Sequence, residues 1–125
     1  MEIKPTAIDK AFHKFDTPVG PVYFVKRHWN TRRCFSRDRA LWHLATFMTT
    51  RTFCRSDFRL RYPDIPLGPG RVQRGDLTVE YHEARDRCIR RLRRILAHKR
   101  EIQKWNEKYD AWAVRWDEMM KQRPY

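Results

Sequence analysis

The sequence is poor in the residues that build disulfide frameworks, metal sites and membrane spans. Its three cysteines, Cys34, Cys54 and Cys88, lie far apart and form no CxxC pair. Because disulfide scaffolds and zinc sites need cysteines at paired spacings, neither is expected, and a reducing cytoplasm is predicted. The chain has no apolar run long enough to cross a bilayer, and its first segment, MEIKPTAIDKAFHKF, lacks the apolar core of a signal peptide. We therefore expect neither a transmembrane helix nor a signal peptide.

Signatures of catalysis are also missing. No Walker-type loop, GxGxxG or nucleophile elbow occurs in the sequence. The five histidines have no metal-ligand spacing to one another or to the cysteines. Asp64, Glu80 and His82 are only faintly similar to the paired acids of metal nucleases, and the lysine that such sites need is absent. We therefore predict a protein that is not an enzyme, with no catalytic residue, no metal and no cofactor.

Positive charge is what the sequence has in excess. Lysine and arginine number 28 against 15 aspartates and glutamates, a net charge of +13 over 125 residues. Aromatic residues make up 14% of the chain, so it can bury a core and is not a disordered polyelectrolyte. The length predicts one domain, and the charge favours a polyanionic partner, nucleic acid first. An anionic membrane or an acidic protein would also balance the charge, and a basic domain without such a partner is the plainest alternative.

The N-terminal part, residues 1–62, is expected to be a small α+β unit. A turn around Gly20 precedes the apolar run 22–25, which predicts a central strand, and a turn at Asn30-Thr31 would return the chain as an antiparallel hairpin. Before this hairpin the apolar spacing favours a short helix that ends at the Gly20 turn. Residues 12–16 could equally be the first arm of a hairpin.

A packed helix is predicted after Ser36, a plausible N-cap. Leu41, Leu44, Ala45 and Met48 recur at helical spacing and would pack on the sheet, and the following threonines predict fraying near Arg51. Next, Phe58, Leu60 and Tyr62 alternate with Arg59 and Arg61, which predicts a half-buried strand with an arginine face. Residues 63–76, rich in proline and glycine, are expected to form an irregular loop.

One long helix is predicted over residues 77–123, capped by Asp76, because no proline or glycine occurs before Pro124. Its apolar residues recur in steps of seven, with a second row joining three residues later; the two rows are Tyr81, Cys88, Ile95, Ile102, Tyr109 and Trp116, and then Trp105, Trp112 and Met119. Such a seam is typical of a supercoiled or partner-docking helix. The partner could be a symmetry mate, another protein, or this chain folded back.

The long helix changes charge along its length. From Arg85 to Arg100 eight cations oppose one aspartate, a local charge of +7, whereas residues 105–120 carry a local charge of −2. The basic half predicts phosphate contact, since the guanidinium fork meets phosphate oxygens in pairs. The aromatic half predicts protein contact, with candidate interface residues Ile102, Trp105, Tyr109, Trp112, Trp116 and Met119.

Cations also gather around the predicted hairpin, where Trp29 is either a base-stacking residue or a core aromatic. The complete set of nucleic-acid-binding candidates is Lys26, Arg27, Trp29, Arg32, Arg33, Arg59, Arg61, Arg87, Arg90, Arg91, Arg94, Lys99 and Arg100. The favoured hypothesis is an accessory protein that binds DNA or RNA through phosphates, possesses no membrane partner and could dimerise through its C-terminal helix.

Two alternatives remain open at this stage. The chain could be a small protein of the phage or mobile-element type that docks on a nucleic-acid-processing machine of its host and inhibits or modulates it. It could also be a structural subunit of a ribonucleoprotein or a capsid-like assembly. The order strand, turn, strand, helix is similar in architecture to modules that some phage integrases use to bind DNA arms, although this similarity identifies no family.

Overall fold

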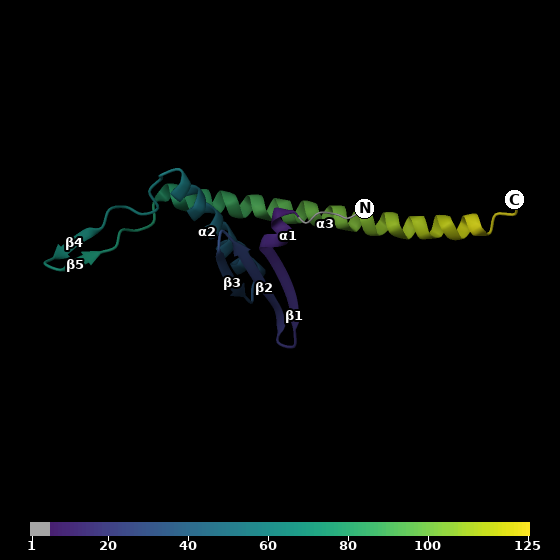
Figure 1. Cartoon of the computed structure of the whole chain (residues 1–125), viewed down its shortest axis with the longest axis horizontal. Helices are drawn as coiled ribbons and strands as arrows, with labels where there is room; N and C mark the ends of the chain where they lie inside the picture. The colour runs from purple at the N-terminus through teal and green to yellow at the C-terminus, as the bar shows by residue number, and fades with distance from the viewer. Residues whose placement is uncertain (1–5) are drawn as a thin grey trace. The chain divides into compact units, whose positions relative to one another are not determined.

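The computed structural model describes residues 6–125, so the first five residues of the predicted 1–62 part lie outside it. The elements, in chain order, are α1 (Ala7–Ala11), β1 (Phe12–Thr17), β2 (Gly20–Arg27), β3 (Asn30–Cys34), α2 (Arg37–Arg55), β4 (Ile65–Gly68), β5 (Arg71–Gln73) and α3 (Val79–Lys121) (Figure 1). The predicted α+β class, with an N-terminal antiparallel sheet, a helix and a long C-terminal helix, is confirmed. The chain divides into two compact units, Met1–Leu92 and Arg93–Tyr125. No helix within residues 6–125 is both long and apolar enough to span a membrane.

The strands β1, β2 and β3 form an antiparallel sheet in that order. Phe12 lies opposite Val25 in this sheet, so the chain becomes a strand immediately after α1. The favoured expectation of a helix reaching the Gly20 turn was therefore wrong. The short helix is closed at its start by Thr6 and Asp9, whose carboxylate accepts from the Thr6 backbone N–H at 2.9 Å, and it ends where Phe12 turns extended.

The turn between β2 and β3 also differs from the expectation. Asn30 pairs with Arg27 inside the sheet, so the loop consists of His28 and Trp29 and not of Asn30 and Thr31. The register explains the difference, because it carries Val25 to the buried face of the sheet and leaves two residues for the turn. Turn-forming residue types alone therefore predicted the wrong position.

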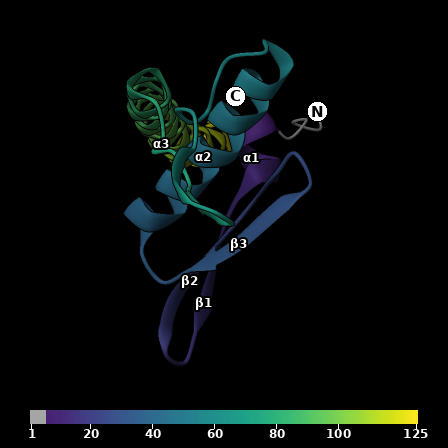
Figure 2. The ribbon, with the colours of Figure 1, turned by 90° about the vertical axis from the view of Figure 1, so that its left-hand side faces the viewer.

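Helix α2 covers one face of this sheet (Figure 2). Its apolar stripe is buried as expected, with Leu41 and Leu44 at 0% exposure against Val25, also at 0%. The helix follows Ser36, whose backbone is extended as in an N-cap, but it continues to Arg55 and does not fray near Arg51. Two threonine hydroxyls of this helix bond within it, Thr46 donating to the Trp42 carbonyl at 2.8 Å and Thr52 to the Met48 carbonyl at 3.0 Å, and the packing outweighs the low helix propensity of threonine.

The segment after α2 contains two corrections. Residues 58–62 form no strand: Arg61 makes an isolated bridge with Leu77, and Phe58 is 63% exposed. Residues 63–76 are not wholly irregular, because β4 and β5 pair as a small antiparallel hairpin. Gly68 and Gly70 provide the positive φ angles of its turn, 131° and 72°, so the glycines that indicated a loop in fact shape a hairpin.

Helix α3 begins at Val79, two residues later than expected. The hydroxyl of Thr78, and not Asp76, accepts the backbone N–H of Tyr81 at 3.2 Å, as an N-cap does. The first turns then pack on α2. The Tyr81 hydroxyl bonds Thr50 Oγ1 at 2.8 Å, its ring meets Phe53 edge-on at 5.4 Å between centroids, and Cys88 Sγ lies 4.0 Å from the sulfur of Met48.

The second unit contains the remainder of α3. The heptad rows are present there as predicted, but no residue of α3 after Leu92 is buried among those the structure describes. Trp105 stacks on Tyr109 with centroids 5.6 Å apart, and Tyr109 meets Trp112 at 6.0 Å, so the aromatic side chains form a stripe along the helix. A coiled coil is therefore not shown, and no residue that the structure describes covers the stripe.

Candidate nucleic-acid interface

The tip of the β2–β3 hairpin has an unusual backbone. His28 and Trp29 both take positive φ angles, 50° and 65°, which is the requirement of a two-residue type I′ turn. Such turns normally use Asn-Gly, and a bulky residue with positive φ is rare because its Cβ crowds the backbone. Residues held in this region cost about 1–3 kcal/mol each and gather at functional sites. Trp29 is also 87% exposed, so the alternative that it is a core aromatic is wrong.

The end of α2 brings two arginines to this tip. The guanidinium carbon of Arg51 lies 5.5 Å from the centroid of the Trp29 ring, a cation–π contact. The pKa of His28 is lowered, first by desolvation and then by the positive charges of Arg27, Arg51 and Arg55. We call Arg27, His28, Trp29, Arg51 and Arg55 the tip cluster. Within residues 6–125 none of its three arginines lies within salt-bridge distance of a carboxylate.

A cation of α3 and a cation of the tip cluster act on the same thiol. Burial raises the pKa of the Cys88 thiol, and the charges of Arg91 and Arg27 act against that shift. Both guanidinium groups therefore lie close enough to Cys88 for their charges to matter, although one comes from α3 and the other from β2. Three elements, β2, α2 and α3, thus contribute cations to one region of the first unit.

The predicted hairpin cations divide between the two faces of the sheet. Arg32 lies opposite Val25, on the face covered by α2, where its charge helps desolvation to lower the pKa of His43. Lys26 follows Val25 on β2 and Arg33 follows Arg32 on β3, so both lie on the opposite, open face of the sheet. Arg33 lines a shallow hollow of about 510 Å³ there, together with Phe15, Thr17, Val22 and Phe24.

Three arginines that the sequence offered as phosphate ligands have contacts in the first unit. Arg61 Nη1 donates to the Gly75 carbonyl at 3.1 Å and so helps to hold the base of the β4–β5 hairpin. Arg59 and Arg87 line an apolar hollow of about 520 Å³ whose aromatic wall is Phe53, Phe58 and Tyr62. Arg61 is therefore a structural residue.

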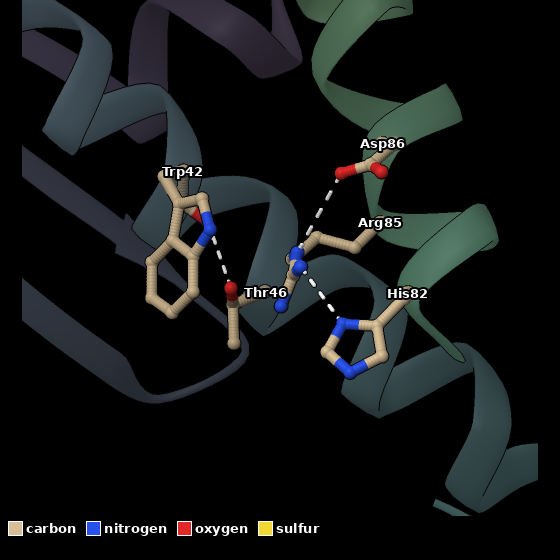
Figure 3. A network of polar contacts seen from close by, with 5 residues as sticks. All are labelled: Trp42, Thr46, His82, Arg85 and Asp86. Atoms are coloured by element: carbon tan, nitrogen blue, oxygen red, sulfur yellow. Dashed lines mark hydrogen bonds and ion pairs between the residues drawn. The ribbon is translucent and has the colours of Figure 1, made fainter. Parts of the chain in front are cut away.

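Arg85 shows how a cation of the basic run can be turned inward. Its guanidinium carbon lies 5.0 Å from the centroid of the Trp42 ring, and Nη2 is 2.9 Å from His82 Nδ1 (Figure 3). The Nε atom is 3.9 Å from an Asp86 oxygen and has no hydrogen-bond partner among the described residues. With 13% of its side chain exposed, Arg85 packs on α2 and cannot meet a phosphate.

All the candidates on α3 are exposed. Arg87, Arg90 and Arg91 belong to the first unit, whereas Arg94, Lys99 and Arg100 belong to the second. Sequence reasoning did not select His28, Arg51 or Arg55 as site residues. The available signal for the two arginines was their i, i+4 spacing, which places Arg51 and Arg55 on one face of the last turns of α2, the helix that returns to the hairpin.

The described residues contain no candidate metal site. No group of three or more histidine, cysteine, aspartate or glutamate side chains within residues 6–125 could hold a metal ion. Comparison of the chain with protein-family models, curated proteins and solved structures gave no match.

Proposed function

We propose that the protein is a non-enzymatic nucleic-acid-binding accessory protein of the cytoplasm that holds phosphates at the tip cluster. The observation that supports this most is the convergence of Arg27, Arg51 and Arg55 around His28, on a strained turn whose other residue, Trp29, is exposed and contacts Arg51. The fold places these like charges together, and no carboxylate of residues 6–125 lies within salt-bridge distance of them, which costs energy unless a polyanion binds. Counterion release from the nucleic acid then supplies most of the affinity.

The chemistry at the tip follows from the residue types. The arginines are planar donors that meet phosphate oxygens in pairs and stay charged at any physiological pH. Trp29 offers a flat face for a base or a sugar, and base–aromatic stacking contributes about 1–3 kcal/mol. A simpler explanation exists for Arg55, because a cation in the last turn of a helix stabilises the helix dipole by about 0.3–1 kcal/mol.

The experiment that separates these explanations compares two arginines of α2 that both lie over a tryptophan. Arg51 lies over Trp29 at the tip, and Arg39 lies over Trp42, 5.6 Å from the ring centroid, near the start of the helix. Fluorescence anisotropy with labelled duplex DNA, single-stranded DNA and RNA would measure the affinity of each variant at several salt concentrations.

We expect Arg51→Gln to weaken binding about tenfold, the effect of one charged hydrogen bond, and Arg39→Gln to leave it unchanged. Changing Arg51 and Arg55 together should also reduce the salt slope by about two charges. The proposed role of the tip cluster would be wrong if Arg51→Gln and Arg39→Gln weakened binding equally. It would also be wrong if the native protein showed no salt-dependent binding.

A second candidate function rests on the exposed aromatic stripe of α3. Trp105 is 63% exposed and Met119 is 64% exposed, values typical of an interface that has lost its partner. We infer from this the alternative of a phage or mobile-element type protein that docks on a host machine and inhibits or modulates it. It predicts that Trp112→Ala abolishes capture of that machine while nucleic-acid affinity is retained.

A further inference from the structure

The apolar row of α3 changes its surroundings part-way along. Tyr81 is 3% exposed and Cys88 is half-buried, because α2 covers both. From Ile95 onward the same row is open, with Ile102 at 48%, Tyr109 at 52% and Trp116 at 45% exposure. The second row is equally open at Trp105, Trp112 and Met119. A stripe of this kind in water needs a cover.

The charges beside the stripe indicate what that cover is. Residues 93–104 contain five cations and one glutamate, a charge of +4, whereas residues 107–118 contain four acids and two cations, a charge of −2. Two copies of the helix in parallel would place the two basic segments together. In an antiparallel pair each basic segment lies against the acidic segment of the other copy, which is favourable.

We propose that a second copy of this chain covers the stripe, and that the two helices pair antiparallel about an axis near residue 107. In this register three of the four exposed members of the first row each face a member of the second, and the fourth, Trp116, faces His98. Ile95 meets Met119, Ile102 meets Trp112, and Trp105 meets Tyr109. Each of these pairs forms one layer of the seam and occurs twice in the dimer, as the symmetry of a homodimer requires.

The positions that flank the seam agree with this register. Glu101 is the acid of the basic segment, and it lies about 3 Å along the axis from Arg115, a cation of the acidic segment in the other copy. Lys108 is one residue from the axis and lies about 3 Å along the axis from its own symmetry mate, a like-charge contact that exposed lysines relieve by turning into solvent. Charge therefore selects antiparallel over parallel pairing.

This self-pairing is independent of the proposed nucleic-acid binding, because none of its layers uses a residue of the tip cluster. The two can therefore fail separately. Sedimentation and light scattering of the full chain, freed of nucleic acid by nuclease and high salt, would measure the mass of the particle.

The first test compares Trp112→Glu with Val114→Glu. Both side chains are 57% exposed on the same helix, but only Trp112 belongs to the seam. We expect a dimer for the native chain and for Val114→Glu. For Trp112→Glu we expect a monomer, with dimer dissociation at least about thirtyfold easier. A native chain that remains a monomer at micromolar concentrations, or equal disruption by both variants, would overturn the proposal.

The second test determines orientation. Because Ile102 faces Trp112 only in the antiparallel register, Ile102→Lys and Trp112→Glu should each disrupt the dimer, and their combination in one chain should restore it. There the introduced lysine of one copy meets the introduced glutamate of the other. In a parallel pair the same two changes place like charges together, so the double variant would be the weakest of all.

Cross-linking of the native dimer provides a readout that does not depend on variants. With one copy isotopically labelled, a short amine-reactive reagent should join Lys99 of one copy to Lys121 of the other, about 9 Å apart along the axis. The two Lys121 side chains should not be joined, because they lie roughly 42 Å apart in the antiparallel register. Abundant links between the two Lys121 residues would show a parallel pair and overturn the proposal.

Discussion

The two parts of α3 use the same heptad row in opposite ways. Up to Leu92 the row is a structural element of the first unit, since α2 covers Tyr81 and Cys88. After Leu92 it is exposed, and its side chains have no cover within the part of the chain that the structure describes. A continuous sequence pattern can therefore support a core at one end and an interface at the other. What distinguishes the ends is whether an element of the same chain covers the row.

The largest difference is expected between two tyrosines at equivalent heptad positions. Tyr81 is 3% exposed and bonded to Thr50, whereas Tyr109 is 52% exposed. Tyr81→Ala leaves a cavity beside Phe53 and should lower the free energy of unfolding of the first unit by about 3–5 kcal/mol. Tyr109→Ala should change it by less than about 0.5 kcal/mol.

Urea denaturation of both variants, followed at protein concentrations below dimer formation, would measure this difference. Tyr81→Phe is the matched control, since it keeps the ring and removes only the hydroxyl, and should cost about 1 kcal/mol. Equal losses for Tyr81→Ala and Tyr109→Ala would mean that the second half of the helix is also part of a folded core.

A smaller contrast is expected between two arginines of the basic run. Arg85 packs on Trp42 and contacts His82, whereas Arg100 is exposed. Arg85→Ala removes the cation–π contact and the buried stem and should cost about 1–2 kcal/mol of unfolding free energy. Arg100→Ala should cost less than about 0.5 kcal/mol.

Thermal unfolding would measure both arginine variants, with Arg85→Met as a control that keeps the apolar stem. Because Arg85 Nε has no hydrogen-bond partner among the described residues, Arg85→Met should restore much of the lost stability. A methionine variant as unstable as the alanine variant would show that the charge, and not the packing, holds this position.

The elements with long periodic patterns could be predicted from the sequence. The stripe of Leu41, Leu44 and Ala45 identified α2 and its buried face, and the absence of proline and glycine identified α3. Periodicity identifies such helices because burial of one face follows directly from spacing. Their ends were less predictable, since α2 continues through its threonines to Arg55 and α3 is capped by Thr78 instead of Asp76.

The candidate site was only partly predictable, because its geometry depends on pairing between distant residues. The chain has no Asn-Gly at the β2–β3 turn, and His28-Trp29 carries no signal for a type I′ turn. Only the register of the sheet places Trp29 there, and only the return of α2 brings Arg51 beside it. Arg61 and Arg85 count as cations in the sequence, yet each contacts its own chain.

The smallest expected effect is a difference in alkylation rate between two cysteines, one that α2 covers and one that is exposed. Cys88 belongs to the heptad row under α2, whereas Cys54 is exposed. Burial raises the pKa of the Cys88 thiol in the folded protein, so this group contributes stability below its unfolded pKa and loses that contribution as the pH rises through the folded value. The thiolate is the reactive form, so at about pH 8 alkylation of Cys88 should be several times slower than that of Cys54.

Mass spectrometry of alkylated peptides over a time course would measure both rates, and Met48→Ala, which thins the cover over Cys88, should bring them closer. Equal rates in the native protein would mean that α2 does not protect the row, and the contrast between the two parts of α3 would then rest on the tyrosines alone.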